Sequence, residues 1–198
     1  MTGTAPNRPE PPLIAEPLTL PGCLKIFPKV HRDERGRLVK TVHHETYSRY
    51  GLISSFREQF YSFSRRGVLR GLHVQLPPAE QHKLVACLQG EVLDVILDLR
   101  TDSPTYGQHE LVPLDGERGA MVYMPPGIAH GFYACDDSLL LYHVTTQHAP
   151  AQDAGIHWNS VGISWPDSQP VLSERDRTFP SLAEFASPFR FHPEGSPL

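Results

Sequence analysis

Between residues 56 and 145 the chain alternates short apolar runs with turn signals, and this spacing limits the folds open to it. The chain has 20 proline and 15 glycine residues, which favour many turns over long helices. Evenly spaced short strands separated by turns are typical of an antiparallel barrel or sandwich. The fold class is therefore predicted to be mainly β. The predicted strands are residues 56–64, 67–75, 83–88, 91–99, 108–114, 120–124, 130–134 and 139–145.

The two ends of the chain differ from this pattern. Residues 1–12 are polar and proline-rich, so we expect a disordered tail rather than a signal peptide. The chain has 198 residues and no visible second core, so residues 13–198 are expected to form one domain with a C-terminal extension. Outside the central region we expect strands at 24–27 and 37–42, a short helix at 44–50 and another around 181–186.

Composition excludes several classes of protein. A formal net charge of -4 leaves no basic excess to neutralise phosphates, which argues against a general nucleic-acid binder. No apolar run approaches the roughly 20 residues that span a bilayer, so no membrane segment is expected. The three cysteines, Cys23, Cys87 and Cys135, are odd in number and widely spaced. They are read as reduced thiols of a cytoplasmic protein.

The predicted strand Gly67–Gln75 carries two residues that are costly to bury, Arg70 and His73. Gly71 lies between them, where the missing side chain would let another backbone or a ligand come close. For a lone Arg-x-x-His the structural explanation is the more common one: an arginine paired with a carboxylate and a hydrogen-bonded core histidine. Two later stretches, Pro125–Phe132 and Ser173–Asp176, favour a functional explanation instead.

The first of these stretches places a histidine, His130, just after a tight turn. Its spacing, Gly119-x5-Pro125-x-Gly127-x-x-His130, resembles the second motif of cupins, which are small jelly-roll barrels. In many cupins this histidine binds a metal beside a His-x-His pair. Here His73-Val74-Gln75 offers one imidazole, so a catalytic metal is not expected. A metal-dependent cupin isomerase or dioxygenase that uses His73, Gln75 and His130 is the alternative.

Without a metal, His73 is free to act as a general base. Such a base needs an acceptor that orients it, and Asp176 is the candidate. Lys83, on the following strand, could stabilise an oxyanion. Tyr142, in the apolar run Leu139–Tyr142, could give or take a proton, although an ordinary core tyrosine would look the same.

Taken together, the motifs of this chain resemble those of the dTDP-4-dehydrorhamnose 3,5-epimerase family. The resemblance covers about residues 22–185, nearly the whole chain. So many motifs in one order are highly specific. They are Asp33–Gly36, Arg70-Gly71-Leu72-His73, His82–Val85, Gly90–Val95, Asp98–Arg100, Ser103–Gly107, Pro125–Phe132, Trp158-Asn159 and Gly162–Pro166.

The resemblance implies a cupin-like jelly-roll barrel with short peripheral helices, free of cofactor and metal. It implies a homodimer in which the N-terminal strands cross onto the partner's sheet. The implied activity is epimerisation of the carbons that flank the keto group of a nucleotide-linked 4-keto-6-deoxy sugar. The implied catalytic set is His73 as base, Asp176 as its support, Lys83 at the enolate oxygen and Tyr142 as the acid.

The same resemblance suggests the residues that bind the nucleoside diphosphate and the sugar. Arg70 and His130 would line the sugar and phosphate pocket, and Arg35 would contact the nucleotide. The full expected substrate-binding set is Arg35, Lys40, Glu58, Phe60, Arg70, His130, His148, Asp153 and Arg175.

Several substrate-reading positions depart from the family pattern. Lys40 stands where the family has a glutamate, and Glu58-Gln59-Phe60 replaces Gln-Asp-Asn. His148 replaces a tyrosine, and the Trp-Asn-Asp-Pro stretch is shortened to Trp158-Asn159-Ser160. We therefore expect retained chemistry on a shifted substrate. The alternatives are an epimerase of C3 or C5 alone, a substrate linked to another nucleotide such as CDP, or a sugar-binding cupin without catalysis.

Overall fold

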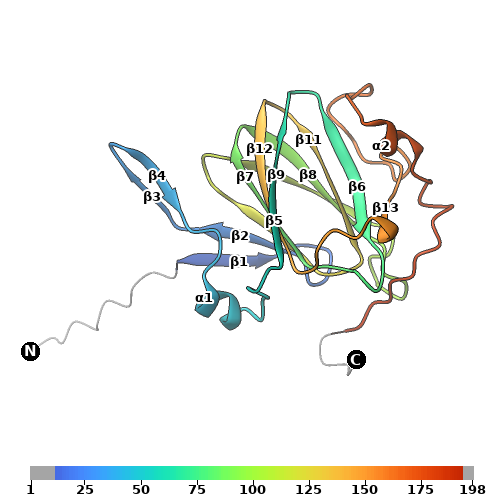
Figure 1. The fold of residues 1–198 in the computed structure, drawn as a ribbon, viewed down its shortest axis with the longest axis horizontal. Coiled ribbons are helices and arrows are strands. Elements are labelled where there is room, and N and C mark those ends of the chain that lie inside the picture. The colour runs from blue at the N-terminus through green and yellow to red at the C-terminus, as the bar shows by residue number, and fades with distance from the viewer. Residues whose placement is uncertain (1–11, 194–198) are drawn as a thin grey trace, which may run out of the picture.

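The computed structural model describes residues 12–193, which form two antiparallel sheets packed face to face (Figure 1). The six-stranded sheet has the order β1 (Leu13–Pro17), β2 (Leu24–Pro28), β10 (Met121–Met124), β7 (Lys83–Gln89), β12 (Ser138–Val144) and β5 (Glu58–Ser64). The five-stranded sheet has the order β13 (Asp153–Gly155), β6 (Leu69–Gln75), β11 (Ile128–Ala134), β8 (Glu91–Asp98) and β9 (His109–Asp115). The expected mainly-β, cupin-like jelly roll is confirmed.

The main core lies between the two sheets. It is made of apolar residues that point inward from both, since side chains alternate between the two faces of each strand. Among its buried members are Val85, Cys87, Ile96, Val122 and Phe132. Tyr142 belongs to the same cluster, and its hydroxyl brings a polar group to the edge of this core.

The outer face of each sheet is covered by a separate apolar layer. The C-terminal segment covers the five-stranded sheet, where Ile156, Ile163 and Phe189 pack against Leu72 and Leu97. Helix α1 (His44–Arg49) and the segment after it cover part of the six-stranded sheet, where Tyr47 and Leu52 are buried among strand residues. The C-terminal segment also carries the short helix α2 (Glu174–Thr178), which lies beside β6. Close to β13 is the one-turn 3-10 helix η1 (Pro150–Gln152).

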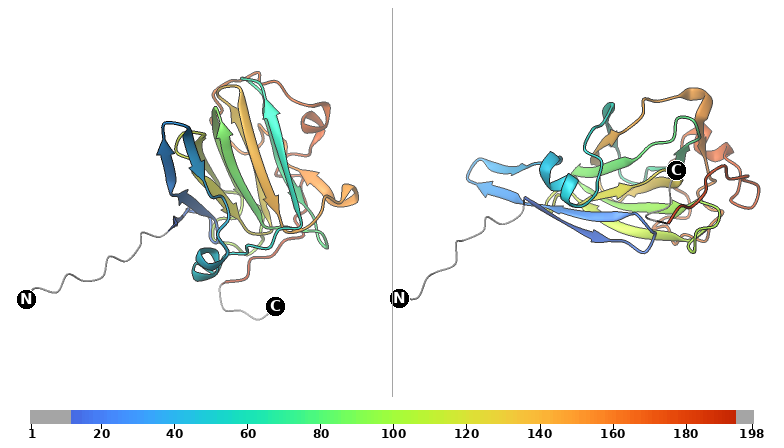
Figure 2. Two further views of the ribbon diagram at one scale, coloured as in Figure 1. Left: turned by 60° about the vertical axis from the view of Figure 1, so that its left-hand side comes forward. Right: turned by 90° about the horizontal axis from the view of Figure 1, so that it is seen from below.

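A β-hairpin projects away from the barrel (Figures 1 and 2). Its strands are β3 (Val30–Asp33) and β4 (Gly36–Val39), joined by a tight turn at Asp33–Gly36. The carboxylate of Glu117 accepts hydrogen bonds from Arg32 and Arg37 and so ties the hairpin to the barrel. Its far end extends beyond these contacts into solvent.

The strands predicted for the barrel are confirmed, with ends that differ by a few residues. The helix at 44–50 is also confirmed, and the strand expected at 37–42 ends at Val39. β1, β3 and β13 were not predicted, because each is short and mostly polar or exposed. The disordered tail expected for residues 1–12 lies outside the described residues except for Pro12.

The helix predicted around residues 181–186 is wrong. Ser181 starts a single turn, with its carbonyl accepting from the Phe185 N–H at 3.1 Å, and no helix follows. Pro188 disfavours helical geometry at the residue before it, which leaves too little chain for a second turn. The helix of this region is α2 instead, where the Ser173 side chain caps the first turn by accepting from the Asp176 N–H at 3.1 Å. Within residues 12–193, no helix is long and apolar enough to cross a membrane.

Gly71 lets two strands of the five-stranded sheet approach unusually closely, as its position in the sequence suggested. A Cβ added there would lie 2.6 Å from the Gly131 Cα of β11. The backbone of Gly71 also has φ +137°, a region that side chains disfavour. Since the Gly71 N–H donates to the Asp176 carboxylate at 3.2 Å, this glycine also fixes the position of α2.

We predict that Gly71→Ala lowers the free energy of unfolding more than Gly36→Ala does. Gly36 has a similar φ of +123° but nothing within 4 Å of an added Cβ, so its substitution measures the backbone strain alone, about 1–3 kcal/mol. Gly71→Ala should cost about 1–3 kcal/mol more, because the methyl group must displace packed backbone. Urea denaturation measures both variants. Equal losses would show that the contact with Gly131 carries no cost.

Candidate active site

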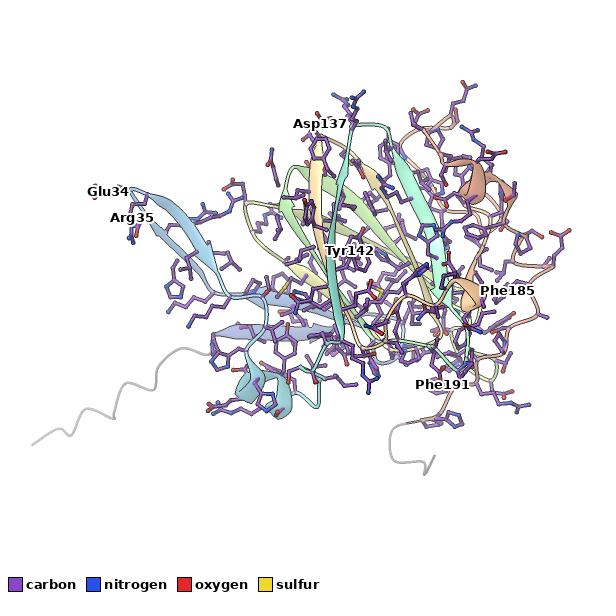
Figure 3. The ribbon with its side chains drawn as sticks, viewed as in Figure 1. Glu34, Arg35, Asp137, Tyr142, Phe185 and Phe191 are labelled. Atoms are coloured by element: carbon purple, nitrogen blue, oxygen red, sulfur yellow. The ribbon has the colours of Figure 1, made fainter. Side chains whose placement is uncertain are left out.

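A cavity of about 250 Å³ opens between the two sheets at one end of the barrel. Its walls come from β5, β6, β7, β11 and β12, with the loop before η1 and helix α2 at its mouth. Tyr142 lies within the barrel between the strands of the two sheets (Figure 3). The predicted site residues that line the cavity are Phe60, Arg70, His73, Lys83, His130, Tyr142, His148, Asp153 and Arg175.

The expected pairing of His73 with Asp176 is present. The two side chains lie 2.9 Å apart, between Nε2 of His73 and Oδ1 of Asp176. Asp176 is the third residue of α2 and its side chain is only 3% exposed, whereas the His73 side chain is 25% exposed. An ionised carboxylate can only accept, so Nε2 carries the proton and donates it. The free lone pair is therefore on Nδ1 of His73.

The environment keeps this pair in the state that a base requires. Burial lowers the pKa of the His73 imidazole below its ordinary value, and the hydrogen bond and charge of Asp176 offset only part of that shift. Burial alone would raise the pKa of Asp176, but hydrogen bonds from His73 and the Gly71 N–H hold it below its ordinary value. At neutral pH the pair is a neutral imidazole beside a carboxylate.

Lys83 reaches the cavity from the opposite sheet. Its Nζ donates to the backbone carbonyl of His73 at 3.3 Å, which brings the ammonium next to the base. Burial lowers the pKa of Lys83 to about 8, while the carboxylates of Asp153 and Asp94 work in the other direction. The amine is therefore largely protonated at neutral pH.

Tyr142, on β12, is nearly buried, with 7% of the residue exposed. Its hydroxyl lies 3.3 Å from Oγ of Ser62, and its ring is stacked on that of Phe60. Burial raises the pKa of the phenol well above its ordinary value, and the hydrogen bond with Ser62 opposes this only in part. Tyr142 therefore holds its proton throughout the physiological range.

His130, which lines the cavity, forms a second histidine–carboxylate pair with the buried Asp94. Nε2 of His130 and Oδ2 of Asp94 are 2.7 Å apart, and both residues are buried. Burial raises the pKa of Asp94, against the opposing effects of His130 and Lys83. The sequence showed Asp94 as a polar residue within an aliphatic strand, the signal that could have identified it. It was not assigned to the site because its partner is 36 residues away.

The mouth of the cavity carries the remaining cations. Arg175 forms an ion pair with Asp153 and lies 3.5 Å from the Asp176 carboxylate. Arg70 donates from Nε to Oγ of Ser64 at 2.9 Å and from Nη2 to the Phe63 carbonyl at 3.3 Å. Such fixed guanidinium groups suit the recognition of phosphate oxygens.

The side chains of Gln75 and Glu58 are hydrogen-bonded to backbone groups near the mouth. The Gln75 side chain donates to the carbonyls of Ala79 and Gln147, and its Oε1 accepts from the Ala149 N–H at 2.9 Å. Glu58 accepts from the backbone N–H of His148 at 2.8 Å and does not line the cavity. A metal site formed by His73, Gln75 and His130 would therefore require Gln75 to break its hydrogen bonds with Ala79, Gln147 and Ala149. Among residues 12–193 no group of three or more His, Cys, Asp or Glu side chains could hold a metal ion.

Three of the expected substrate-binding residues do not line this cavity: Glu58, described above, and two residues of the hairpin region, Arg35 and Lys40. Arg35 lies at the tip of the β3–β4 hairpin, far from Tyr142, with its side chain 85% exposed and paired with Asp33 (Figure 3). Lys40, just after β4, is exposed beside the hairpin and not in the cavity wall. The fold of this chain therefore does not bring Arg35 and Lys40 into the cavity.

Other residues of the cavity were not predicted. Ser62 and Gln81 line it from β5 and from the loop before β7, and Phe132 and Val144 supply its apolar wall. Ser62 lies two positions after Phe60 on the same strand, so the alternation of β5 could have placed it on the same face. Gln81 lies in a loop, where periodicity gives no such signal.

Comparison with known proteins gives consistent matches over most of the chain. The family model described as dTDP-4-dehydrorhamnose 3,5-epimerase matches residues 17–184. The dTDP-4-dehydrorhamnose 3,5-epimerase of Salmonella typhimurium is 39% identical over 168 residues, which are 82% of this chain and 92% of that protein. The dTDP-4-dehydro-6-deoxyglucose 3-epimerase of Streptomyces bikiniensis is 36% identical over 177 residues, 84% of this chain and 88% of that protein.

Solved structures agree with these matches. The crystal structure of a dTDP-6-deoxy-D-glucose-3,5-epimerase from Legionella pneumophila, in complex with dTDP-4-keto-L-rhamnose, has a TM-score of 0.86 and 33% sequence identity. The match covers 91% of this chain and all of that one, at 100%.

We predict that the His73 imidazole stays neutral at pH 7 with its proton on Nε2, and that Asp176→Asn lowers its pKa further. The reason is that the charge and hydrogen bond of Asp176 favour the imidazolium form, so their loss favours the neutral one. Nitrogen-15 NMR titration of the histidine side chains measures both effects. Asp167→Asn, which changes a half-buried loop carboxylate that accepts from the Gln169 N–H and does not line the cavity, is the matched control. An unchanged or higher pKa in Asp176→Asn would contradict the assigned hydrogen bond.

Proposed function

Because the chain belongs to the dTDP-4-dehydrorhamnose 3,5-epimerase family, we propose that the residues of this cavity carry out that family's proton transfers. The chain is an isomerase that epimerises a nucleotide-linked 4-keto-6-deoxy sugar at C3, C5 or both. One observation carries the assignment of roles: His73 and Tyr142 enter the cavity from opposite sheets. Inversion of a carbon needs a base on one face of the sugar and an acid on the other.

The first step is removal of a proton from a carbon beside the keto group. Nδ1 of His73 takes this proton, and the electron pair of the broken C–H bond moves to form a C=C bond while the C4 oxygen becomes an enolate. The buried Asp176 carboxylate holds the imidazole in the right tautomer and stabilises the imidazolium that forms.

The enolate is the species that the cavity must stabilise. Lys83 lies beside His73, and its ammonium is positioned to hold the C4 oxygen as negative charge develops there. The low exposure of the site strengthens this attraction, since charges interact more strongly away from water. A proton beside a ketone is otherwise too weakly acidic for a neutral imidazole.

The second step delivers a proton to the opposite face. The Tyr142 hydroxyl gives its proton to the carbon, and the enolate electron pair forms the new C–H bond as the C4 keto group returns. The resulting phenolate is costly in its buried setting, so Tyr142 must regain a proton, and His73 must lose one, before the next turnover. Exchange of both protons with solvent completes the cycle.

The size of the cavity supports a binding mode in which only part of the substrate lies inside it and the rest lies at its mouth. About 250 Å³ is smaller than the roughly 300–1,000 Å³ of sites that hold whole drug-sized ligands. We assign the sugar to the interior and the diphosphate to the mouth, where Arg70, Arg175 and His148 lie. The nucleoside would then extend past the rim, toward a surface that the same chain does not cover.

We further propose a homodimer in which the β3–β4 hairpin of one protomer crosses to the other. The hairpin has little packing of its own, and Leu38 on it is 57% exposed. The outer face of β5 exposes Tyr61 and Phe63, at 72% and 54%, in the part of the six-stranded sheet that α1 leaves open. A two-fold arrangement would cover these apolar groups and bring Arg35 to the partner's substrate.

The domain organisation and the location of the chain are part of this proposal. Residues 13–198 are proposed to act as one domain, since the C-terminal segment that follows the barrel supplies Asp176 to the site. A cytoplasmic location is supported by the free thiols of Cys23, Cys87 and Cys135.

We predict that His73→Asn lowers the rate of C–H exchange by about a hundredfold or more, because a general base contributes about that much. The measurement is deuterium incorporation into dTDP-4-dehydro-6-deoxyglucose in deuterated water, followed by NMR. His192→Asn, at an exposed position far from the cavity, is the control and should exchange normally. A folded His73→Asn variant with near-normal exchange would remove His73 from this role.

We predict a dimer in sedimentation at micromolar concentration, and a monomer for the double variant Tyr61→Asp, Phe63→Asp. Two buried carboxylates would be costly to desolvate in an apolar interface, whereas both positions tolerate charge in a free chain. Tyr106→Asp, an exposed aromatic in the turn between β8 and β9, should remain dimeric. A wild-type monomer, or a dimer that survives the double change, would contradict this arrangement.

The departures at Lys40, Glu58 and Phe60 led us to expect a base other than thymine; against that expectation, we now predict that the chain binds dTDP more tightly than CDP by about tenfold or more, roughly 1.4 kcal/mol. Two of the three positions that suggested a shifted base are engaged inside the chain, since Glu58 binds the His148 N–H and Phe60 stacks on Tyr142. The relatives named above act on dTDP-linked sugars by their names. Calorimetry with both nucleotides tests this. Equal or tighter CDP binding would contradict this prediction. It would indicate that Lys40 of a partner subunit recognises the nucleotide base.

A further inference from the structure

The ring of Tyr142 is held from three directions. Phe60 covers one face, with ring centroids 4.7 Å apart and planes only 9° from parallel. His130 approaches its edge, with centroids 6.1 Å apart and planes at 76°. The hydroxyl is held by Oγ of Ser62 at 3.3 Å. These contacts leave the phenol little freedom to swing about its side-chain torsions.

Among these contacts, the Phe60 stack is not needed to fill the core. Phe60 and Tyr142 are directly opposite each other in the β5–β12 ladder, which places their side chains on the same face of the sheet. Phe60 is 44% exposed, so its ring is neither a member of the buried core nor shielded from water. What it does contact is the ring of the proposed acid. Its effect is therefore expected on the position of Tyr142 rather than on folding.

The position of an acid decides which atom it can protonate. The two carbons that flank the C4 keto group lie on either side of it, so one phenol oxygen cannot be equally close to both. A misplacement of about 1 Å can cost about a hundredfold in rate. An acid that moves, or a sugar that shifts, serves both carbons in turn, whereas an acid held in place serves one.

We infer that Phe60 is a positioning residue that holds Tyr142 against a single carbon, so that this chain inverts one of the two centres far faster than the other. The inference rests on the proposed function, in which Tyr142 donates the second proton. It adds that the stack of Phe60, on β5, against Tyr142 determines which carbon is epimerised faster. Ser62, two residues along the same strand, fixes the hydroxyl in the same direction.

The test compares exchange at the two carbons in one experiment. Wild type, Phe60→Leu and Phe60→Tyr are incubated in deuterated water with dTDP-4-dehydro-6-deoxyglucose and, in parallel, its CDP-linked counterpart. NMR gives the rate of deuterium incorporation at C3 and at C5 separately. Tyr106→Leu removes an aromatic ring of similar exposure, 43% against 44%, far from the cavity, and is the matched control.

The expected result is a ratio of the two rates of about tenfold or more in wild type, the scale set by small displacements of an acid. Phe60→Leu should bring the ratio severalfold closer to one, chiefly by raising exchange at the slow carbon. Phe60→Tyr keeps a stacking ring and should preserve the wild-type ratio, as should Tyr106→Leu. A merely structural role for Phe60 would lower both rates together and leave their ratio unchanged.

The outcomes separate this inference from the function on which it rests. Similar exchange at both carbons in wild type, or an unchanged ratio in Phe60→Leu, would overturn the inference and leave the epimerase function standing. No exchange at either carbon, with either nucleotide, would overturn the proposed roles and the inference together. Selective wild-type exchange that loses its selectivity only when the ring is removed would support it.

Discussion

The hydrogen bond between His73 and Asp176 joins parts of the chain that are 103 residues apart, and much of the site depends on it. A carboxylate with 3% exposure must find donors, because an unpaired buried charge costs several kcal/mol. Its donors are the His73 imidazole and the Gly71 N–H, both on β6. The hydrogen bonds that the Asp176 carboxylate accepts therefore fix helix α2 against β6. The C-terminal segment then covers the five-stranded sheet with its apolar residues, and Arg175 lies at the mouth of the cavity.

The chemistry is divided between the two sheets. The five-stranded sheet supplies the base and the His130–Asp94 pair, and the six-stranded sheet supplies Lys83 and Tyr142. Their separation is set by the apolar core further down the barrel, which holds the sheets at a fixed spacing. A small change in that packing would move base and acid relative to each other, so the core contributes to function through geometry as well as through stability.

Burial acts on the three proton-carrying groups in different directions. It lowers the pKa of His73 and of Lys83, to about 8 for the amine, and raises that of Tyr142. The same low-dielectric cavity thus leaves a neutral base, a cation that is still largely charged, and an acid that keeps its proton. All three states are those that the proposed proton transfers need at neutral pH. Nearby carboxylates moderate the shift of Lys83, and without them its charge would be lost closer to neutrality.

The sequence by itself determined the barrel strands and most of the cavity wall. Alternating apolar runs and proline or glycine turns are local signals, and polar residues such as His73, Lys83 and Tyr142 were conspicuous within apolar strands. Tertiary structure decided what depends on distant contacts. Asp94 joined the site through a cross-strand partner, and α2 formed where Asp176 found its donors. The stack of Phe60 on Tyr142 arose from the pairing of β5 with β12, and Arg35 was carried away from its own cavity by the hairpin. In each case the deciding energy comes from residues far apart in the chain, which local patterns do not encode.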